Sequence, residues 1–356
     1  MTRNPSRRIC PLLHRRPALS CGVRRRPSRP PPRLSVPLVR RARLLLEGLI
    51  VLASIPLPAG AGNPLFRAAD PHAVVIDHQV WIYPTGGGRG QQFFAWASSD
   101  LVRWDRRGPI LDFANIPWIK EDKAPNHSAW APALALRNKK MYLYYSVGPQ
   151  NPTPSRIGVA VAENPAGPFQ DSGRPLLAGG HGFEAIDPMV FEDPATKKWY
   201  LYAGGSAGAT LRVFEMNDDM TSLARQIKVA TPPQFTEGVF MHVRRGTYYL
   251  SYSHGNWRDA TYSVHYATAP SPIGPWTYRG PILESNAKHK GPGHHSVFYL
   301  PGLDQWFIVY HRYNNRSGNG PFDGPREVCI DRLDYNADGL LRKVEMTDTG
   351  VSLEKK

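Results

Sequence analysis

Aromatic and aliphatic residues cluster in short strand-like segments that return at a long period from residue 63 onward. Each unit opens with a dipeptide that leads into an apolar stretch, passes a turn and reaches a segment rich in Trp, Tyr and Phe. Such a period, about 50 to 60 residues here, is typical of repeat architectures. The five openers are Asp70-Pro71, Ala131-Pro132, Asp187-Pro188, Glu237-Gly238 and His294-His295.

The segments between the units are rich in Pro and Gly, as in residues 164–169 and 271–276, and such residues mark chain reversals. No stretch shows a helical period with caps. Short strands at this spacing, four to a unit, predict an all-β fold, a five-bladed β-propeller. A single β-sandwich or barrel is the alternative, but five units in register favour the propeller.

The repeat predicts where the openers lie in space. The innermost strands of a propeller run alongside its axis, so residues at one repeat position converge at one end of that axis. Asp70, Asp187 and Glu237 should therefore lie close together, with Ala131 and the His294-His295 pair completing the ring. Acids held close together repel one another. Because each is followed at once by an apolar strand, this ring is the strongest chemical signal in the chain.

Charge separates the chain into two parts. Residues 1–60 contain thirteen Arg and one acid, Glu47, a local net charge of +12 out of the +15 of the whole chain, which leaves +3 for the remainder. An electrostatic footprint for nucleic acid should lie on the folded surface. The basic excess lies in the leader instead, so we expect no nucleic-acid partner.

The leader has the pattern of an export signal. Residues 1–43 are rich in Arg and Pro, and we expect them to be disordered. A basic stretch at 40–43, an apolar run at 44–56 and small residues at 59–62 then describe a signal peptide, although Glu47 interrupts the apolar run. The run is shorter than the ~20 apolar residues of a membrane span. We therefore expect a leader over 1–62, a propeller domain over 63–356 and a secreted or periplasmic protein.

Cysteine usage excludes a disulfide in the body. Cys10 and Cys21 lie in the leader, which leaves Cys329 alone. It stands in an apolar strand-like run, where a buried, unreactive thiol is the expectation and a catalytic role the alternative.

With these motifs in order, the chain resembles the family 43 glycoside hydrolases, five-bladed propellers that include arabinanases, α-L-arabinofuranosidases and β-xylosidases. The resemblance covers about residues 63–350. It rests on motifs at blade spacing: Ala69-Asp70-Pro71, Trp130-Ala131-Pro132, Ala185-Ile186-Asp187-Pro188, Thr236-Glu237-Gly238, Gly293-His294-His295 and Arg326-Glu327-Val328.

The resemblance implies roles for the three acids. Asp70 matches the general base that activates water, and Glu237 matches the general acid that protonates the leaving oxygen. Asp187 matches the acid that tunes and orients Glu237, and its charge could raise the pKa of Glu237 if it stays ionised. The family inverts the anomeric configuration, which requires two carboxyl groups roughly 6.5–9.5 Å apart. No cofactor is implied for the chemistry.

Other site residues are expected at the ring. His294 matches a histidine that helps to bind a calcium ion in parts of the family, often through water, although calcium prefers oxygen ligands. Arg326 matches an arginine that binds a sugar hydroxyl or a carboxylate, and an ordinary ion pair is the alternative. Trp130, Phe94 and Trp96 are candidates to pack against the apolar face of a sugar.

The implied function is an inverting hydrolase that releases arabinose, or xylose, from plant arabinan or arabinoxylan-type chains. A β-xylosidase or a galactan-type exo-glycosidase on the same fold is one alternative, because loops decide the substrate. A non-catalytic sugar-binding propeller is another, but it should lack one of the three acids. A protein-interaction propeller would need no carboxylate ring.

Overall fold

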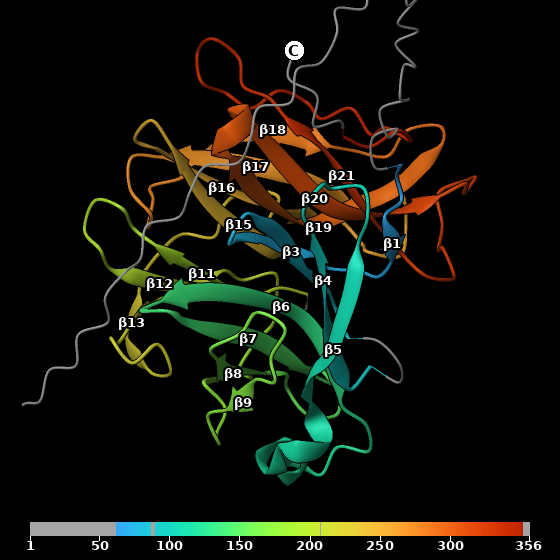
Figure 1. The fold of residues 1–356 in the computed structure, drawn as a ribbon. Helices are drawn as coiled ribbons and strands as arrows, with labels where there is room; N and C mark the ends of the chain where they lie inside the picture. The colour runs from blue at the N-terminus through green and yellow to red at the C-terminus, as the bar shows by residue number, and fades with distance from the viewer. Residues whose placement is uncertain (1–61, 87–89, 207, 352–356) are drawn as a thin grey trace, which may run out of the picture. The chain divides into compact units, whose positions relative to one another are not determined.

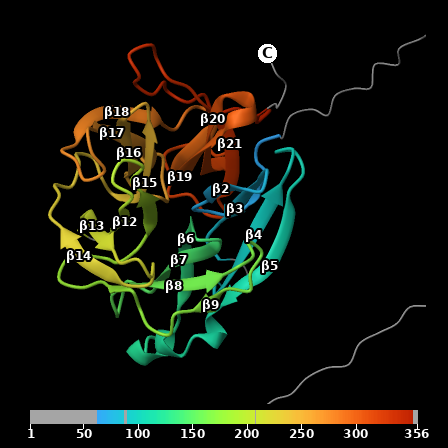
Figure 2. The ribbon, with the colours of Figure 1, turned by 60° about the vertical axis from the view of Figure 1, so that its left-hand side comes forward.

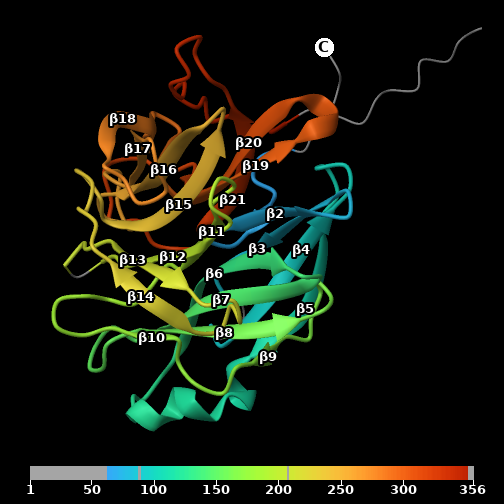
Figure 3. The same ribbon diagram turned by 90° about the vertical axis from the view of Figure 1, so that its left-hand side faces the viewer.

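The computed structural model describes residues 62–86, 90–206 and 208–351, and these form five antiparallel sheets. The innermost strands of the sheets contact one another in a closed ring, β2 to β6, β11, β15, β19 and back to β2. Figure 3 shows these five strands gathered at the middle of the domain, with the other strands of each sheet lying outward. The five-bladed β-propeller predicted from the repeat is confirmed, and the sandwich or barrel is excluded.

Each blade is a meander whose strands follow the chain from the axis outward (Figure 1). Blade one contains β2 (His72–Ile76), β3 (Gln79–Tyr83), β4 (Gln92–Ser98) and β5 (Asp105–Asp112). Blade two contains β6 (Ser128–Arg137), β7 (Lys140–Gly148), β8 (Arg156–Ala162), β9 (Gln170–Asp171) and β10 (Leu177–Ala178). Blade three contains β11 (Met189–Glu192), β12 (Trp199–Ala203), β13 (Arg212–Met216) and β14 (Leu223–Ile227).

The last two blades differ in how they end. Blade four contains β15 (Glu237–Arg244), β16 (Thr247–His254), β17 (Ser263–Ala269) and β18 (Thr277–Leu283). Blade five contains β19 (His289–Leu300), β20 (Gln305–Asn314) and β21 (Glu327–Leu333), and its outermost strand is β1 (Phe66–Arg67) from the start of the domain. Figure 2 shows the start of the domain beside β20 and β21. Three 3₁₀ helices lie between strands: η1 (Phe113–Asn115), η2 (Pro117–Asp122) and η3 (Pro301–Leu303).

The predicted leader, residues 1–62, lies outside the described residues except for Gly62, so its disorder and its export signal stay predictions. Residues 352–356 of the predicted propeller domain lie outside them too. Among the helices of the part that is described, none is long and apolar enough to cross a bilayer. Cys329 is fully buried in β21, and burial raises the pKa of its thiol, which agrees with the expected packing role.

The blades pack face to face through large apolar side chains, and the turn-rich connectors are fixed to this core. Tyr83 of blade one donates a hydrogen bond from its hydroxyl to the carbonyl of Pro165, 2.9 Å away, in the connector of blade two. Tyr202 of blade three makes the same bond, at 2.6 Å, to Pro272 in the connector of blade four. A buried tyrosine needs a partner for its hydroxyl, and here that partner also holds the neighbouring blade.

The ring closes where β1 pairs with β21, and a buried asparagine completes the closure. Asn63 donates from Nδ2 to the carbonyl of Ile330 (3.0 Å) and accepts the N–H of the same residue at Oδ1 (2.9 Å). Its own N–H donates to the carbonyl of Asp348 (2.8 Å). The side-chain amide therefore makes the pair of hydrogen bonds to Ile330 that the backbone of a neighbouring strand would make. It does so at the point where the two ends of the domain meet.

We expect Asn63→Ala to weaken this closure. The substitution removes all four hydrogen bonds of the Asn63 side chain, two of them to Ile330, and leaves the Ile330 backbone groups without partners. This should cost about 2 kcal/mol of unfolding free energy. Thermal unfolding of residues 62–356 would show a melting temperature several degrees lower. Asn115→Ala, at an exposed position in η1, is the control and should change little; equal melting temperatures for the two variants would contradict the role of Asn63.

Candidate active site

Near the start of the inner strand, every blade has a residue with the same unusual backbone conformation. One residue of each opener has a positive φ, between 36° and 63°. This is the left-handed region, which most residues avoid. These residues are Asp70, Ala131, Asp187, Gly238 and His294. Asp70, Asp187 and His294 at these bends, and Glu237 beside Gly238, all line one cavity.

Four of the five bends are held by the preceding blade. The backbone N–H of the left-handed residue donates to a side chain at the end of that blade's second strand. These bonds run from Ala131 to Thr85 Oγ1 (2.8 Å), from Asp187 to Ser146 Oγ (2.9 Å), from His294 to Ser253 Oγ (2.8 Å) and from Asp70 to His311 Nδ1 (3.1 Å).

Blade three breaks the pattern. Its matching position is Gly204, whose N–H donates to the carbonyl of Ile186 but which has no side chain to accept a bond from blade four. The N–H of Gly238 donates to Oδ2 of Asp187 instead, at 3.0 Å. Asp187 is thereby bound to the residue that directly follows Glu237. The prediction that the three acids occupy matched positions is therefore wrong for Glu237, which stands one residue before the left-handed position.

The bends surround a cavity of about 340 Å³ at one end of the axis. Asp70, Asp187 and Glu237 all line it, and each side chain is largely buried, with residue exposures of 8%, 6% and 8%. The other lining residues are Trp130, Gln150, Ile186, Ser206, Trp257, His294 and Arg326. The structure thus brings together all three predicted acids with the predicted Trp130, Arg326 and His294.

Asp70 is held as a carboxylate. Burial by itself would raise its pKa, but the Arg326 guanidinium, with Nη1 2.9 Å from Oδ1, and the nearby histidines keep the pKa well below its usual range. Thr85 donates a hydrogen bond to Oδ2. His311 is neutral at pH 7, because burial lowers its pKa to about 4, and its Nδ1 accepts the Asp70 N–H. An ionised, hydrogen-bonded carboxylate in a closed cavity has the properties of a general base.

The surroundings of Asp187 shift its pKa in the opposite direction from that of Asp70. Burial, and then the negative charges of Glu237 and Asp70, raise its pKa well above the usual range. Its link to the N–H of Gly238 and the more distant Arg326 oppose that shift without cancelling it. Asp187 therefore retains its proton at a pH where a solvated aspartic acid would have lost it.

Glu237 is fixed at both carboxyl oxygens. Tyr262 donates its hydroxyl to Oε1 at 2.8 Å, and the hydroxyl of Ser206 lies 2.7 Å from Oε2. The phenol can serve Oε1 only as a donor while burial keeps it protonated, and burial does raise the pKa of Tyr262. Ser206, which donates its hydroxyl to Oε2, lines the cavity, so Oε2 is the oxygen on the cavity side. This arrangement suits a general acid that releases its proton into the cavity.

His294 lies between two of the acids. Its Nδ1 is 3.6 Å from Oδ1 of Asp70 and 3.5 Å from Oδ2 of Asp187, and burial lowers its pKa. Within the described ranges, no group of three or more His, Cys, Asp and Glu side chains is arranged to hold a metal. Calcium takes roughly six to eight oxygen ligands. An ion at His294 would have to take most of them from water, and the predicted calcium stays a prediction.

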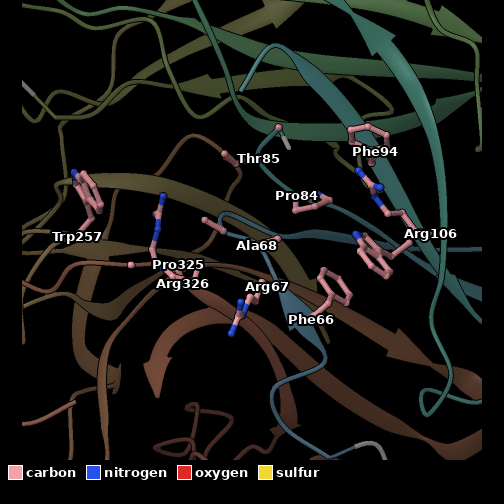
Figure 4. A pocket seen from close by; sticks show the side chains of 14 residues that line it. Phe66, Arg67, Ala68, Pro84, Thr85, Phe94, Arg106, Trp257, Pro325 and Arg326 are labelled. Carbon is pink, nitrogen blue, oxygen red and sulfur yellow. The ribbon is translucent and has the colours of Figure 1, made fainter. Parts of the chain in front are cut away.

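Phe94 and Trp96 do not line this cavity. They belong to β4 and line a neighbouring pocket of about 670 Å³, where Trp96 stacks on Phe66. Trp257 and Arg326 line both spaces and form the boundary between them. Figure 4 shows these two residues on one side of the neighbouring pocket and Phe94 on the other. Phe94 and Trp96 therefore lie apart from Trp130, and their contact with a sugar stays a prediction.

Several site residues were missed from the sequence. Thr85 and His311 could have been found by aligning the ends of the second strands, where a polar residue recurs in four of the five blades. Tyr262, Ser206 and Trp257 had no such signal, because they lie in loops whose lengths differ between blades.

Comparison with known proteins agrees with this geometry. Residues 61–341 match the sequence model of the glycosyl hydrolases family 43. The chain belongs to glycoside hydrolase family 43. As a member of that family it is a glycosidase, an enzyme that hydrolyses glycosidic bonds.

Individual relatives cover most of the chain. It is 38% identical over 323 residues to the β-D-galactofuranosidase xynD of Aspergillus niger, covering 85% of this chain and 90% of that one. It is 30% identical to an arabinoxylan arabinofuranohydrolase of Bacillus subtilis, covering 82% of this chain and 66% of the relative. A solved structure of a thermostable family 43 glycoside hydrolase superposes with a TM-score of 0.69 at 28% identity, covering 83% and 99% of the two chains.

We expect Gly205→Ala to displace Glu237. A Cβ at this position would lie 2.4 Å from Cβ of Glu237, so the acid must move. A shift of about 1 Å in a catalytic group can lower activity about a hundredfold, and kcat/KM should fall on that order while the fold persists. Gly302→Ala, whose Cβ would meet no atom within 4 Å, is the control. Full activity in Gly205→Ala would contradict the close packing of Glu237.

We expect Arg326→Gln to move the acidic limb of the pH profile. Arg326 lowers the pKa of Asp70, and a base is active only when deprotonated, so activity is lost as the pH falls through that pKa. Removing the guanidinium raises the pKa and should move the acidic limb of kcat/KM upward by about 1 to 2 pH units. Arg258→Gln, which loses an ion pair to Asp323, should leave the limb in place. A limb that moves equally in both variants would argue against Asp70 as its origin.

Proposed function

We propose that the chain is an inverting exo-glycosidase that removes a terminal furanoside, with α-L-arabinofuranose as the first candidate. The observation that carries the proposal is the unequal electrostatics of the cavity. Asp70 is held ionised by Arg326, whereas burial and the charges of Glu237 and Asp70 raise the pKa of Asp187, which is bound beside Glu237. A base and an acid at the same pH are what an inverting hydrolase requires.

In this mechanism the acids act on opposite sides of the sugar. The Asp70 carboxylate accepts a proton from the attacking water, whose oxygen forms the new bond to the anomeric carbon. Glu237 donates its Oε2 proton to the glycosidic oxygen as the bond to the leaving group breaks. Asp187 positions Glu237 through its hydrogen bond to the N–H of Gly238. Trp130 provides a partly exposed indole for the apolar face of the sugar.

The size of the cavity supports exo action on a single sugar. At about 340 Å³ it lies at the small end of the range of small-ligand sites, roughly 300–1,000 Å³, which suits a terminal sugar better than the middle of a polymer chain. Relatives at 30% identity or more are named for arabinofuranoside and galactofuranoside hydrolysis, and more distant ones for xylosidase or arabinanase activity.

A β-D-galactofuranoside is the second candidate, favoured by the relative of that name at 38% identity. The two sugars have the same configuration around the furanose ring. They differ only in the substituent on C4, which is hydroxymethyl in arabinose and a two-carbon diol in galactose. One cavity could therefore accept either ring, and the space around that substituent would decide between them.

We propose also that the protein is exported, on the basis of the basic, apolar and small-residue segments at 40–62. A polysaccharide substrate outside the cell would require export. Fusing residues 1–62 to a reporter that is active only after export would test this, and a reporter retained in the cytoplasm would contradict it.

The decisive experiment is an assay of residues 62–356 on aryl α-L-arabinofuranoside, β-D-galactofuranoside and β-D-xyloside. Glu237→Ala should retain more activity on aryl glycosides, whose leaving groups need little protonation, than on oligosaccharides. Asp70→Ala should lose nearly all activity on both. NMR of the first product formed should show the inverted anomer. Binding of oligosaccharides without hydrolysis of any glycoside would favour a sugar-binding propeller instead.

A further inference from the structure

The acid and the base of the proposed mechanism come from blades that are not neighbours. Glu237 begins β15 of blade four, and Asp70 precedes β2 of blade one. Blade five lies between them, since its inner strand β19 contacts both β15 and β2. An inverting hydrolase needs its two carboxyl groups roughly 6.5–9.5 Å apart. That separation must therefore be maintained across blade five.

Two buried rings, Tyr262 and His311, connect the two acids across this blade. The Tyr262 hydroxyl donates to Oε1 of Glu237 at 2.8 Å. The Tyr262 ring is stacked on the ring of His311, with centroids 5.7 Å apart and planes 11° from parallel. His311 in turn accepts the backbone N–H of Asp70 at Nδ1, at 3.1 Å. These contacts form a continuous link from the acid to the base.

Blade five fixes the position of the Tyr262 ring. Gly293 of β19 and His311 of β20 are partners in the sheet, and a Cβ on Gly293 would lie 2.0 Å from a carbon of the Tyr262 ring. The ring therefore lies directly on the Gly293 backbone. Tyr262 and His311 are almost completely buried, with residue exposures of 1% and 0%. Because a protein core is closely packed, these surroundings restrict both rings to one arrangement.

His311 differs from the residues that occupy its position in other blades. In blades one, two and four a hydroxyl accepts the N–H of the next bend, that of Thr85, Ser146 or Ser253. A serine could therefore serve the Asp70 N–H as well as the imidazole does. Nε2 of His311 is also buried without a hydrogen-bond partner among the described residues, which lowers stability. Holding the bend does not by itself explain a histidine here, whereas its contact with Tyr262 does.

The other route between the acids is looser. His294 Nδ1 lies 3.6 Å from Oδ1 of Asp70 and 3.5 Å from Oδ2 of Asp187. Both distances exceed the range of about 2.7–3.2 Å that is typical of such hydrogen bonds. The link through Tyr262 and His311 is therefore the closer connection between base and acid.

We infer that Tyr262 and His311 are positioning residues, whose stacked rings form a spacer that fixes the distance between the acid and base carboxyl groups. The inference rests on the roles proposed above for Glu237 and Asp70. Neither ring lines the catalytic cavity. The spacer therefore affects the rate of bond cleavage rather than the binding of the sugar.

Two substitutions each break one contact of the spacer. Tyr262→Phe keeps the ring and removes the bond to Glu237. His311→Ser keeps an acceptor for the Asp70 N–H, as in blades two and four, and removes the ring. On an oligosaccharide, each should lower kcat roughly tenfold with KM within about twofold of wild type, a smaller loss than the hundredfold of a 1 Å displacement. Because either change interrupts the same link, the double variant should also lose roughly tenfold, instead of the hundredfold expected of independent effects.

Tyr252→Phe is the matched control. Tyr252 lies on β16 of the same blade, is buried and donates its hydroxyl to the carbonyl of Pro233 at 2.7 Å, but it does not line the cavity. It should lower the melting temperature about as much as Tyr262→Phe does and leave kcat unchanged. Equal losses of kcat in these two variants, or full additivity of Tyr262→Phe with His311→Ser, would overturn the inference.

Crystal structures of wild type and the two spacer variants separate this inference from the proposed function, because the carboxyl separation can be measured whether or not a furanoside is hydrolysed. The separation of Glu237 and Asp70 should change in both variants. An unchanged separation would contradict the spacer even in an active furanosidase. A changed separation in an enzyme that cleaves only another class of glycoside would support the spacer and contradict the proposed substrate.

Discussion

A left-handed residue at the opening of each inner strand, tied by its N–H to the neighbouring blade, determines the geometry of the active site. Asp70, Asp187 and His294 all occupy this conformation, which costs a residue with a side chain on the order of 1 kcal/mol or more. The bonds to Ser146, Ser253 and His311 hold the backbone there. Because each acceptor belongs to the preceding blade, the positions of the acids depend on closure of the whole ring rather than on any one blade.

Blade three has a glycine, Gly204, where the other blades have a hydrogen-bonding side chain, and Asp187 binds the Glu237 segment in its place. If the position of Gly204 carried a serine, its hydroxyl could accept the N–H of Gly238, and Asp187 would lose that partner. Gly204 has φ of +122°, and a Cβ there would lie 2.1 Å from the carbonyl oxygen of Thr210, so no side chain is accommodated. Gly205 similarly leaves the space that Glu237 fills. Two adjacent glycines therefore couple Asp187 to the Glu237 segment, and the charge of Glu237 helps to raise the pKa of Asp187.

The sequence was sufficient for the architecture and for the presence of the acids, but not for their arrangement. Aromatic strands repeating behind dipeptide openers predict five blades, because five units in register favour a propeller over a single sandwich or barrel. The opener Glu237-Gly238 gave no indication of which residue takes the left-handed conformation, because glycine adopts it without cost. Phe94 and Trp96 alternate with buried residues along β4, which predicts that they share a face but not which cavity that face meets. Tyr262 and Ser206 depend on loop paths that no repeat determines.

Arg326 ties the electrostatics of the base to the wall of the cavity. Its Nη1 lies 2.9 Å from Oδ1 of Asp70, and its guanidinium lies 4.9 Å from the ring centroid of Trp257, which lines the same cavity. Burial alone would raise the pKa of Asp70 and lower that of Arg326, but each charge stabilises the other, so both groups stay ionised. Because Arg326 comes from the last blade and Asp70 from the first, the ionised base also depends on closure of the ring.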